Sequence, residues 1–408
     1  MNKAYKYKLD PTKKQQHMLF QAMGNARFIY NWGLNKKKDA WANGKQKLSY
    51  CELSQMVTEM KKQEEYQWLS LCGRQCLTQS LRNLDNAFTR FFKKQSKFPN
   101  FKSKHSKQSV KFSNPPKMDF DNWKIKVPTI GWIKMKKNRI FDADKIKFGT
   151  LTIHYDNKGT FWCIVLVDDL QTIPQKANVE EKTTIGIDFG IKAYATLSDG
   201  TKIENPKYLE STDRKLRLLN RRLVRKQKGS KNREKARVQL AKYYEKITNK
   251  REDFTNKLST EWIRKYDTLC LEDLNITGMT QNHHLARAIN SAAWNSMVRK
   301  LVYKSNWYGK NIIFIGRFDP SSKMCNKCGY INKELQLSDR EWVCPICGEY
   351  HDRDVNAAIN IKNFGLHPQA LVGIENKIPQ GSGILGVEGN EDAHPMKHQH
   401  SKSILNGI

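Results

Sequence analysis

Four cysteines near the C-terminal end of the chain have the spacing of a metal site. Cys325 and Cys328 form one Cys-x-x-Cys pair, Cys344 and Cys347 form a second, and fifteen residues separate the two pairs. A glycine follows each pair, which is typical of a tight turn that directs two thiolates at one point. Four thiolates leave no open coordination position, so they suit one structural Zn²⁺ and not a reaction centre. Ordinary buried cysteines are the alternative interpretation.

Acidic residues at three other places could carry a reaction. Asp188 ends one apolar segment, Glu272 ends another, and Asp354 opens a helical pattern. Carboxylates at the ends of parallel strands converge on one edge of a sheet. Three such carboxylates repel one another unless a cation neutralises them, and Mg²⁺ is a hard cation that prefers oxygen ligands. Two Mg²⁺ ions could stabilise the attacking and leaving oxygens of a phosphodiester displacement.

At two of these three places, spacing alone does not decide which of two neighbouring acids is the metal ligand. Asp352 could be the ligand, with Asp354 as the helix cap, and Asp273 competes with Glu272 in the same way. Residues on opposite faces of a strand cannot both reach one site, so one member of each pair is a spectator. Any single acid after an apolar strand is also a common turn or cap residue.

The net charge indicates what class of partner the protein binds. The chain has 72 Lys and Arg against 40 Asp and Glu, a balance of +32. Such an excess destabilises a compact chain by self-repulsion, and it implies a polyanion, with nucleic acid favoured over a membrane. We find no apolar run long enough to span a bilayer and no apolar segment of a secretory signal. The remaining cysteines show no disulfide framework, so we expect a cytoplasmic protein.

The elements that must position these residues change in type along the chain. Residues 3–9 alternate as a strand does, and helical patterns fill 12–94, opening at Thr12 with Gln15 as its capping-box partner. From 110 to 167 the apolar period is two, and the last two strands form a hairpin. This block predicts a small β-barrel or twisted sheet that the first strand joins, with the helices inserted within it.

An α/β region follows a polar linker and contains a strongly basic segment. Residues 207–251 carry seventeen Lys or Arg and only four acids. Leucine spacing predicts two amphipathic helices that turn at Gly229. Like charges one helical turn apart repel, so we interpret the segment as a hairpin that faces nucleic acid, with Arg221, Arg222 and Arg225 as candidate contacts. A solvated charged face is the alternative.

Several short motifs along the chain carry a family resemblance. They are Gly186-Ile187-Asp188-Phe189-Gly190, Leu271-Glu272-Asp273-Leu274, Ser321-Ser322, Cys325-x-x-Cys328-Gly329, Cys344-x-x-Cys347-Gly348, Asp352-Arg353-Asp354-x-Asn356-Ala357-Ala358, and in the N-terminal part Tyr5 to Thr12, Gly24 to Asn31 and Phe98 to Lys102. This set resembles the TnpB family of transposon-encoded, RNA-guided DNA endonucleases, which are similar to compact type V CRISPR effectors.

The resemblance implies a multidomain α+β fold and assigns the acids. It implies a RuvC-type (RNase H-like) nuclease domain in which Asp188, Glu272 and Asp354 are the catalytic acids and bind Mg²⁺. The expected parts are a wedge-type β-barrel at 1–9 and 106–180, a helical recognition domain inserted at 10–105, the RuvC-like domain at 181–318 and 351–365 with its basic helical hairpin at 207–260, and a four-Cys zinc ribbon at 319–350. The resemblance does not cover residues 366–408, whose composition, rich in Gly, His, Asn and Pro, predicts a disordered tail.

The resemblance also implies the partners. A guide RNA would pair with one strand of double-stranded target DNA and displace the other, and one site would cut next to a short flanking motif. We expect a prokaryotic, nucleoid-associated protein that needs neither a membrane nor a small-molecule substrate. The alternatives are a non-catalytic guide-RNA- and DNA-binding regulator of the same fold, a transposase that joins DNA ends, and a compact CRISPR effector.

The flanking motif must be read on duplex DNA before pairing starts. Base edges are read by short polar or planar side chains, which helices present in pairs one turn apart. Two such pairs occur in the N-terminal helices, and two more polar residues end a strand where the helices rejoin the barrel. The candidate motif-reading residues are Tyr50, Ser54, Arg74, Thr78, Ser113 and Asn114. Ordinary exposed polar residues are the alternative interpretation for each.

Overall fold

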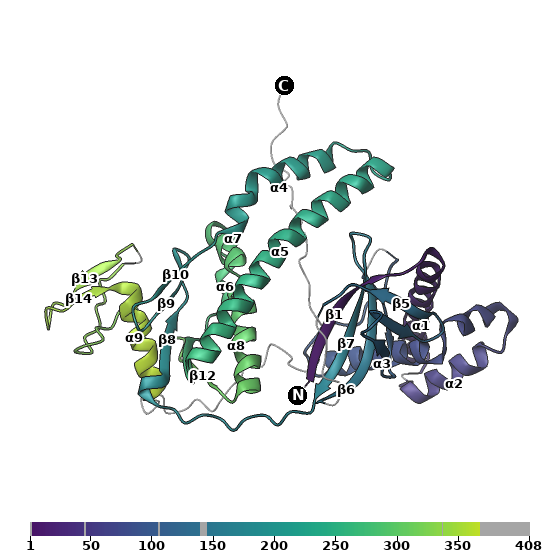
Figure 1. The fold of residues 1–408 in the computed structure, drawn as a ribbon, viewed down its shortest axis with the longest axis horizontal. Coiled ribbons are helices and arrows are strands. Elements are labelled where there is room, and N and C mark those ends of the chain that lie inside the picture. The colour runs from purple at the N-terminus through teal and green to yellow at the C-terminus, as the bar shows by residue number, and fades with distance from the viewer. Residues whose placement is uncertain (1, 45, 105–106, 139–144, 337, 368–408) are drawn as a thin grey trace.

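The protein has two lobes joined by an extended segment (Figure 1). The computed structural model describes residues 2–44, 46–104, 107–138, 145–336 and 338–367. We call residues 2–169 the N-terminal lobe and residues 181–367 the C-terminal lobe. The tail predicted at 366–408 lies outside the described residues, apart from its first two positions.

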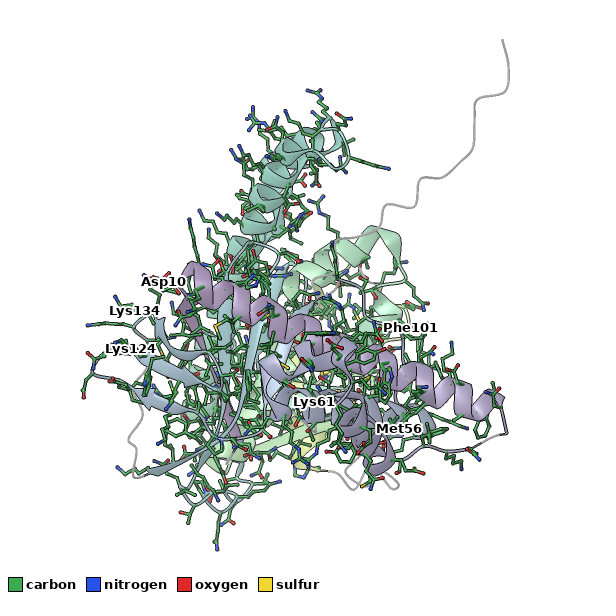
Figure 2. The ribbon with its side chains drawn as sticks, turned by 90° about the vertical axis from the view of Figure 1, so that its right-hand side faces the viewer. Asp10, Met56, Lys61, Phe101, Lys124 and Lys134 are labelled. Atoms are coloured by element: carbon green, nitrogen blue, oxygen red, sulfur yellow. The ribbon has the colours of Figure 1, made fainter. Side chains whose placement is uncertain are left out.

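A seven-stranded antiparallel sheet forms the N-terminal lobe together with three α-helices. Its strands are β1 (Asn2–Asp10), β2 (Gln108–Phe112), β3 (Lys117–Asp119), β4 (Lys124–Val127), β5 (Gly131–Met135), β6 (Ile146–Tyr155) and β7 (Phe161–Asp169), in the spatial order β2-β6-β7-β1-β5-β4-β3. β1 pairs with β7 and with β5, so the first strand lies inside the sheet. Asp10, Lys134 and Lys124 lie on neighbouring strands near one edge (Figure 2). The strand order is linear in the described residues, and a closed barrel remains a prediction.

The helices of this lobe lie between β1 and β2 in the chain. They are α1 (Lys13–Ala42), α2 (Tyr50–Met60), the 3-10 helix η1 (Glu64–Cys72) and α3 (Arg74–Phe92). The predicted capping box at the start of α1 is confirmed, because the Thr12 hydroxyl accepts from the Gln15 backbone at 3.3 Å and the Gln15 side chain accepts from the Thr12 backbone at 3.0 Å. α3 packs against α2, α1 and β2. One apolar core runs from these helices into the sheet.

The C-terminal lobe is built on a five-stranded mixed sheet. Its strands are β8 (Thr184–Asp188), β9 (Ala193–Leu197), β10 (Lys202–Glu204), β11 (Thr268–Glu272) and β12 (Asn311–Ile315), in the order β10-β9-β8-β11-β12. β8, β11 and β12 are parallel, and β9 runs antiparallel to β8. The parallel strands therefore end at the same edge, where polar side chains can converge.

Helices cover both faces of this sheet. α5 (Lys231–Lys265) and α8 (Trp294–Tyr308) cover one face, where Trp262 and Trp294 pack with Ile187 and Leu271. α9 (Arg353–Leu366) covers the other and packs against β8, β9, β11 and β12. The remaining helices are α4 (Tyr208–Val224), α6 (Ile276–Met279) and α7 (His283–Ala292), and the strands β13 (Glu341–Val343) and β14 (Tyr350–Asp352) form a separate small sheet. No described helix offers an apolar stretch long enough to cross a bilayer.

α4 and the first half of α5 form a hairpin that projects from the C-terminal lobe (Figure 1). Leu216, Leu219, Leu240 and Ile247 are buried between the two helices. The turn contains Gly229 at a φ of 84°, a backbone conformation that favours glycine. The charged side chains are therefore left on the outer surfaces of an arm that apolar contacts hold together.

α9 approaches β8 too closely for a side chain at Gly186. A β-carbon there would overlap the carbonyl oxygen of Ala358 and would lie 2.6 Å from the backbone nitrogen of Lys362. The helix thus rests directly on the strand, and Gly186 is required for that contact.

We predict that Gly186→Ala lowers the free energy of unfolding of the C-terminal lobe by about 3 kcal/mol, because backbone atoms cannot move aside as a side chain can. The matched control is Gly24→Ala inside α1, where a β-carbon meets nothing within 4 Å. That variant should be neutral or stabilised by up to about 1 kcal/mol. Urea unfolding followed by circular dichroism measures both, and equal effects would contradict the close packing of α9 on β8.

Candidate functional site

Two of the predicted acids lie side by side at one edge of the sheet. In the parallel pair β8–β11, Leu271 is opposite Ile187, so the next residues, Glu272 and Asp188, end neighbouring strands. Alternate residues of a strand share a face, so Asp188 points to the same side as Gly186, which is the side that α9 covers. The register therefore brings both carboxylates to the α9 face.

The third acid reaches this edge through the direction of α9. Lys362, in the second half of the helix, lies near Glu181, just before β8 (3.9 Å between Nζ and Oε1), so α9 runs antiparallel to the strand. Asp354 is one turn before Ala358, a rise of about 6 Å. Gly186 is two residues before Asp188, about 6.6 Å along the strand. The contact at Gly186 thus places the start of α9 beside Asp188.

The electrostatics of Asp188 reflect this arrangement. Burial raises the pKa of Asp188 to about 8, and the negative charges of Glu272 and Asp354 act in the same direction, while Arg353 and Arg340 oppose the rise. Among the described residues, the three acids do not gather their oxygens within 4.8 Å of one another, as a closed set of metal ligands does. Three neighbouring carboxylates repel one another, and a hard divalent cation bound between them would offset that repulsion.

The two competing acids have other partners. Asp352 is the N-cap of α9, where its Oδ1 accepts from the backbone of Asp354 and of Val355, each at 3.1 Å, and its Oδ2 lies 2.5 Å from Lys202 Nζ. Asp273 accepts from the guanidinium of Arg317 at 2.7 Å. Both carboxylates are thus engaged in structural contacts, which favours Asp354 and Glu272 as the acids that face Asp188.

Polar residues from the chain segment after β12 support Glu272. The hydroxyl of Ser321 donates to Glu272 Oε1 at 2.5 Å, and the side-chain amide of Asn360 in α9 donates to the Ser321 carbonyl at 2.8 Å. Ser321 belongs to one of the motifs that carry the family resemblance, but its contact with Glu272 was not predicted from the sequence. Two asparagines one helical turn apart, Asn356 and Asn360, could have indicated from the sequence that this face of α9 binds the backbone of another segment.

The four cysteines converge as predicted. Their Sγ atoms all lie within 4.8 Å of one another, with 3.7 Å between Cys325 and Cys347 and 3.5 Å between Cys328 and Cys344. A tetrahedral Zn²⁺ with Zn–S bonds of about 2.3 Å needs sulfurs about 3.8 Å apart, so the donor set fits zinc. Gly329 and Gly348 close the two turns at φ values of 78° and 69°.

A histidine that the cysteine spacing did not predict lies beside this cluster. The Nε2 atom of buried His351 lies 3.0 Å from Cys325 Sγ, and its ring packs on Trp342. The cysteine segment is also tied to α9, because Asn356 donates to the Met324 carbonyl at 2.7 Å and accepts from the Asn326 backbone at 3.0 Å. The four-cysteine unit is thus fastened to the helix that carries Asp354.

The candidate motif-reading residues lie on three segments that pack together. Tyr50 and Ser54 lie in the first turns of α2, Arg74 and Thr78 at the start of α3, and Ser113 and Asn114 directly after β2. α3 packs against both α2 and β2. Two of the six also serve the fold: the guanidinium of Arg82 lies 5.4 Å from the Tyr50 ring, and the Thr78 hydroxyl donates to the Arg74 carbonyl at 2.9 Å. Their role in reading DNA remains a prediction.

The candidate arginines of the hairpin are exposed. Arg221 and Arg222 lie in the last turn of α4, and Arg225 is its C-cap. Cations at a helix C-terminus also stabilise the helix dipole, so their position has a structural benefit of its own.

Comparison with known proteins identifies the family. The chain is 38% identical over 371 residues to a protein of Streptomyces pristinaespiralis named "Putative RNA-guided DNA endonuclease", with 91% of each chain covered. The chain belongs to the TnpB family. A relative in Escherichia coli K12, "Putative RNA-guided DNA endonuclease InsQ", is 28% identical, with 89% of this chain and 92% of the relative covered. Family models described as "Probable transposase", "Cas12f1-like, TNB domain" and "Helix-turn-helix domain" match residues 165–283, 294–361 and 1–46. In this TnpB-family chain, residues 1–46 contain β1 and the long helix α1.

Solved structures share the fold. The structure titled "Cryo-EM structure of the Cas12f1-sgRNA-target DNA complex" is 16% identical with a TM-score of 0.55, and the match covers 85% of this chain and 82% of that one. The structure titled "Structure of the mini-RNA-guided endonuclease CRISPR-Cas_phi3" is 9% identical with a TM-score of 0.55, covering 90% and 92%. The mixed α+β, multidomain architecture predicted from the sequence is therefore confirmed.

We predict that the protein in Mg²⁺-free buffer, with its cysteine-bound metal left in place, loses stability as the pH rises. Folding raises the pKa of Asp188 from 3.8 to about 8, so between these values the folded state holds a proton that the unfolded state has released. Stability therefore falls across this range, and Asp188→Asn abolishes that dependence. At about pH 8 this variant should be more stable than the wild type by about 1–3 kcal/mol, with a smaller difference near pH 5.

Urea unfolding at the two pH values measures this difference. Asp121→Asn, a change at an exposed acid of the N-terminal lobe, is the control. If the Asp188 and Asp121 variants shifted the pH profile equally, the raised pKa of Asp188 would be wrong.

Proposed function

We propose that this chain is an RNA-guided, Mg²⁺-dependent DNA endonuclease of a transposable element, which cuts target DNA next to a short flanking motif through a single RuvC-type site. The observation that carries the proposal is that the ends of β8 and β11 and the start of α9, which hold Asp188, Glu272 and Asp354, lie at one edge of a mixed sheet. The negative charges of Glu272 and Asp354 both raise the pKa of Asp188. Membership of the TnpB family supports the substrate and the guide.

Within this proposal the three carboxylates would hold the cation and so help to orient the scissile phosphate. Bound Mg²⁺, two ions in our interpretation, would supply Lewis-acid stabilisation of the charge that develops on the phosphate oxygens. Ser321 fixes the orientation of the Glu272 carboxylate, and the Asp352 cap fixes the start of α9 and so the position of Asp354. Arg340, 3.5 Å from Asp354, adds positive charge for a phosphate.

The four cysteines would bind one structural Zn²⁺ in a ribbon at 319–350. Their role is positional, because a site with four thiolates offers no coordination position for a substrate. The ribbon is fastened to α9 through Asn356 and Asn360. Zinc would therefore stabilise the segment that carries Ser321 against the helix that carries Asp354.

Guide RNA and DNA would occupy the basic surfaces. The hairpin of α4 and α5 would bind phosphates by charge, and the N-terminal lobe would read the flank through α2, α3 and the end of β2. The division into wedge, recognition, nuclease and ribbon domains, and nucleoid association in a prokaryotic cytoplasm, belong to the same proposal. RNA that co-purifies with the protein would argue against a transposase that works without a guide, and its origin in a transposon end or a repeat array separates a transposon nuclease from a CRISPR effector.

We predict that Asp188→Ala, Glu272→Ala and Asp354→Ala each lower the DNA cleavage rate by about 1,000-fold or more and leave RNA and DNA binding intact, because each removes a ligand but little positive surface. Asp267→Ala, a change at an acid just before β11 and so at the opposite end of the sheet, is the matched control and should cut normally. The assay is Mg²⁺-dependent cleavage of matched DNA. Robust cutting by any of the three variants removes that residue from the site.

We predict that changing Arg221, Arg222 and Arg225 together to glutamine weakens binding to all nucleic-acid sequences. The slope of log affinity against log salt should become shallower by about one unit for each phosphate that the variant no longer binds. The control removes three lysines of the N-terminal lobe, Lys124 and Lys126 in β4 and Lys134 in β5. An unchanged slope in the arginine variant, or equal changes in both variants, would mean that the hairpin is only a solvated charged face.

We predict that Tyr50→Ala, Arg74→Ala and Asn114→Ala in combination relax the flanking-motif requirement without affecting RNA binding. Tyr50→Phe, which keeps the ring in its packing and removes the hydroxyl, separates reading from folding. A cleavage screen over randomised flanks measures the requirement. The wild-type motif at full strength from the triple variant would place the reading surface elsewhere.

A further inference from the structure

The chain segment after β12 passes over the edge of the sheet that carries the acids. β12 is parallel to β11, and its last residue, Ile315, is opposite Glu272. Phe318 follows three residues later, and 93% of its surface is exposed, more than that of any other large apolar side chain in the described residues. A phenylalanine is thus held in solvent a few residues from the acids of the proposed nuclease site.

The turn that carries Phe318 is braced on both sides. Asp319 accepts from the Gly316 backbone through Oδ2 at 2.7 Å, and its carbonyl accepts from the Ser321 backbone at 2.8 Å. Arg317 is fixed to Asp273, and Ser321 to Glu272. The backbone on either side of the ring is therefore tied to the residues that end β11, and the position of Phe318 follows that of Glu272.

Exposed apolar residues are common on protein surfaces, so exposure alone is not evidence of function. The next most exposed phenylalanine in the described residues, Phe92 at 70%, packs against two other rings, Phe88 and Phe91. Phe318 has no such ring contact among the described residues, and its neighbours in the chain are Arg317, which is paired with Asp273, and Asp319. An exposed planar ring held beside the end of β11 is suited to stack on a nucleobase, because every base offers a π-face.

We propose that Phe318 stacks on an unpaired base of the DNA strand that enters the acid site and so positions the adjacent phosphate for cleavage. This inference rests on the proposed function. The strand at such a site must be single, because a paired base presents its face to its neighbours in the stack and not to a side chain. Phe318 is a positioning residue: it touches the substrate beside the reacting phosphate and takes no part in proton transfer.

The first test compares variants of the protein with its co-purified RNA on double-stranded DNA that matches that RNA. Phe318→Ala and Phe318→Leu should lower kcat/KM by about tenfold, and Phe318→Trp should restore it, because stacking needs a planar ring. Leu170→Ala, which removes an apolar side chain 60% exposed at the end of β7, is the matched control. Thermal unfolding should be unchanged in all four, because none of these changes affects a buried side chain.

The second test asks whether the effect belongs to a base. An abasic nucleotide moved through the positions around the cut should slow the wild type at one position and should not slow Phe318→Ala further there. In the Asp188→Ala complex, DNA carrying 5-iododeoxyuridine at that position should photocrosslink to Phe318, as mapped by mass spectrometry. This readout does not depend on cleavage.

The outcomes separate the two proposals. Cleavage that depends on Asp188 but is equal in wild type, Phe318→Ala and Phe318→Leu overturns the stacking inference alone. The same holds for a crosslink to other residues and not to Phe318. Cleavage that is unaffected by Asp188→Ala overturns the proposed function itself, whatever the Phe318 variants do.

Discussion

The site depends on one backbone contact, where α9 rests on β8 at Gly186. Glycine at this position lets the Ala358 carbonyl and the Lys362 backbone lie against the strand. The same helix meets β11 at Gly365, where a β-carbon would overlap the Cys270 sulfur. Two glycines, one on the strand and one on the helix, thus fix the distance and direction of α9. This packing brings Asp354, at the start of α9, to the side of the sheet on which Asp188 lies.

The four-cysteine unit acts on the same helix from the other side. Its first pair lies directly after the segment that braces Glu272, and its second pair leads through β14 to the Asp352 cap of α9. Asn356 and Asn360 close the connection by accepting or donating hydrogen bonds between α9 and residues 321–326. A metal that holds the two pairs together would therefore stabilise the approach of Glu272 and Asp354. Under the proposed function, loss of that metal would therefore also disturb the positions of Glu272 and Asp354.

Local patterns in the sequence predicted what depends on local physics. The Thr12 capping box and the turn at Gly229 follow from residue types a few positions apart, and both are present. The choice of Asp354 over Asp352 came from the family resemblance, because spacing could not show which acid caps the helix. That distinction is made by the hydrogen bonds of Asp352 to the start of α9 and by its ion pair with Lys202, 150 residues earlier.

What the sequence could not predict depends on contacts between distant residues. Ser321 and Glu272 are 49 residues apart, and His351 and Cys325 are 26 apart, so neither pair belongs to a local pattern. The exposure of Phe318 was equally hidden, because the same residue in a strand or helix would be expected in the core.

The central claim is that Asp188, Glu272 and Asp354 together bind the divalent cation that cleavage requires. Crystals of the protein grown with Mn²⁺ in place of Mg²⁺ would locate the cation directly by anomalous scattering. The account predicts anomalous density among the three carboxylates, and none there in crystals of Asp188→Ala. Density at Asp273 or Asp352 instead, or density unchanged by the Asp188 substitution, would contradict it.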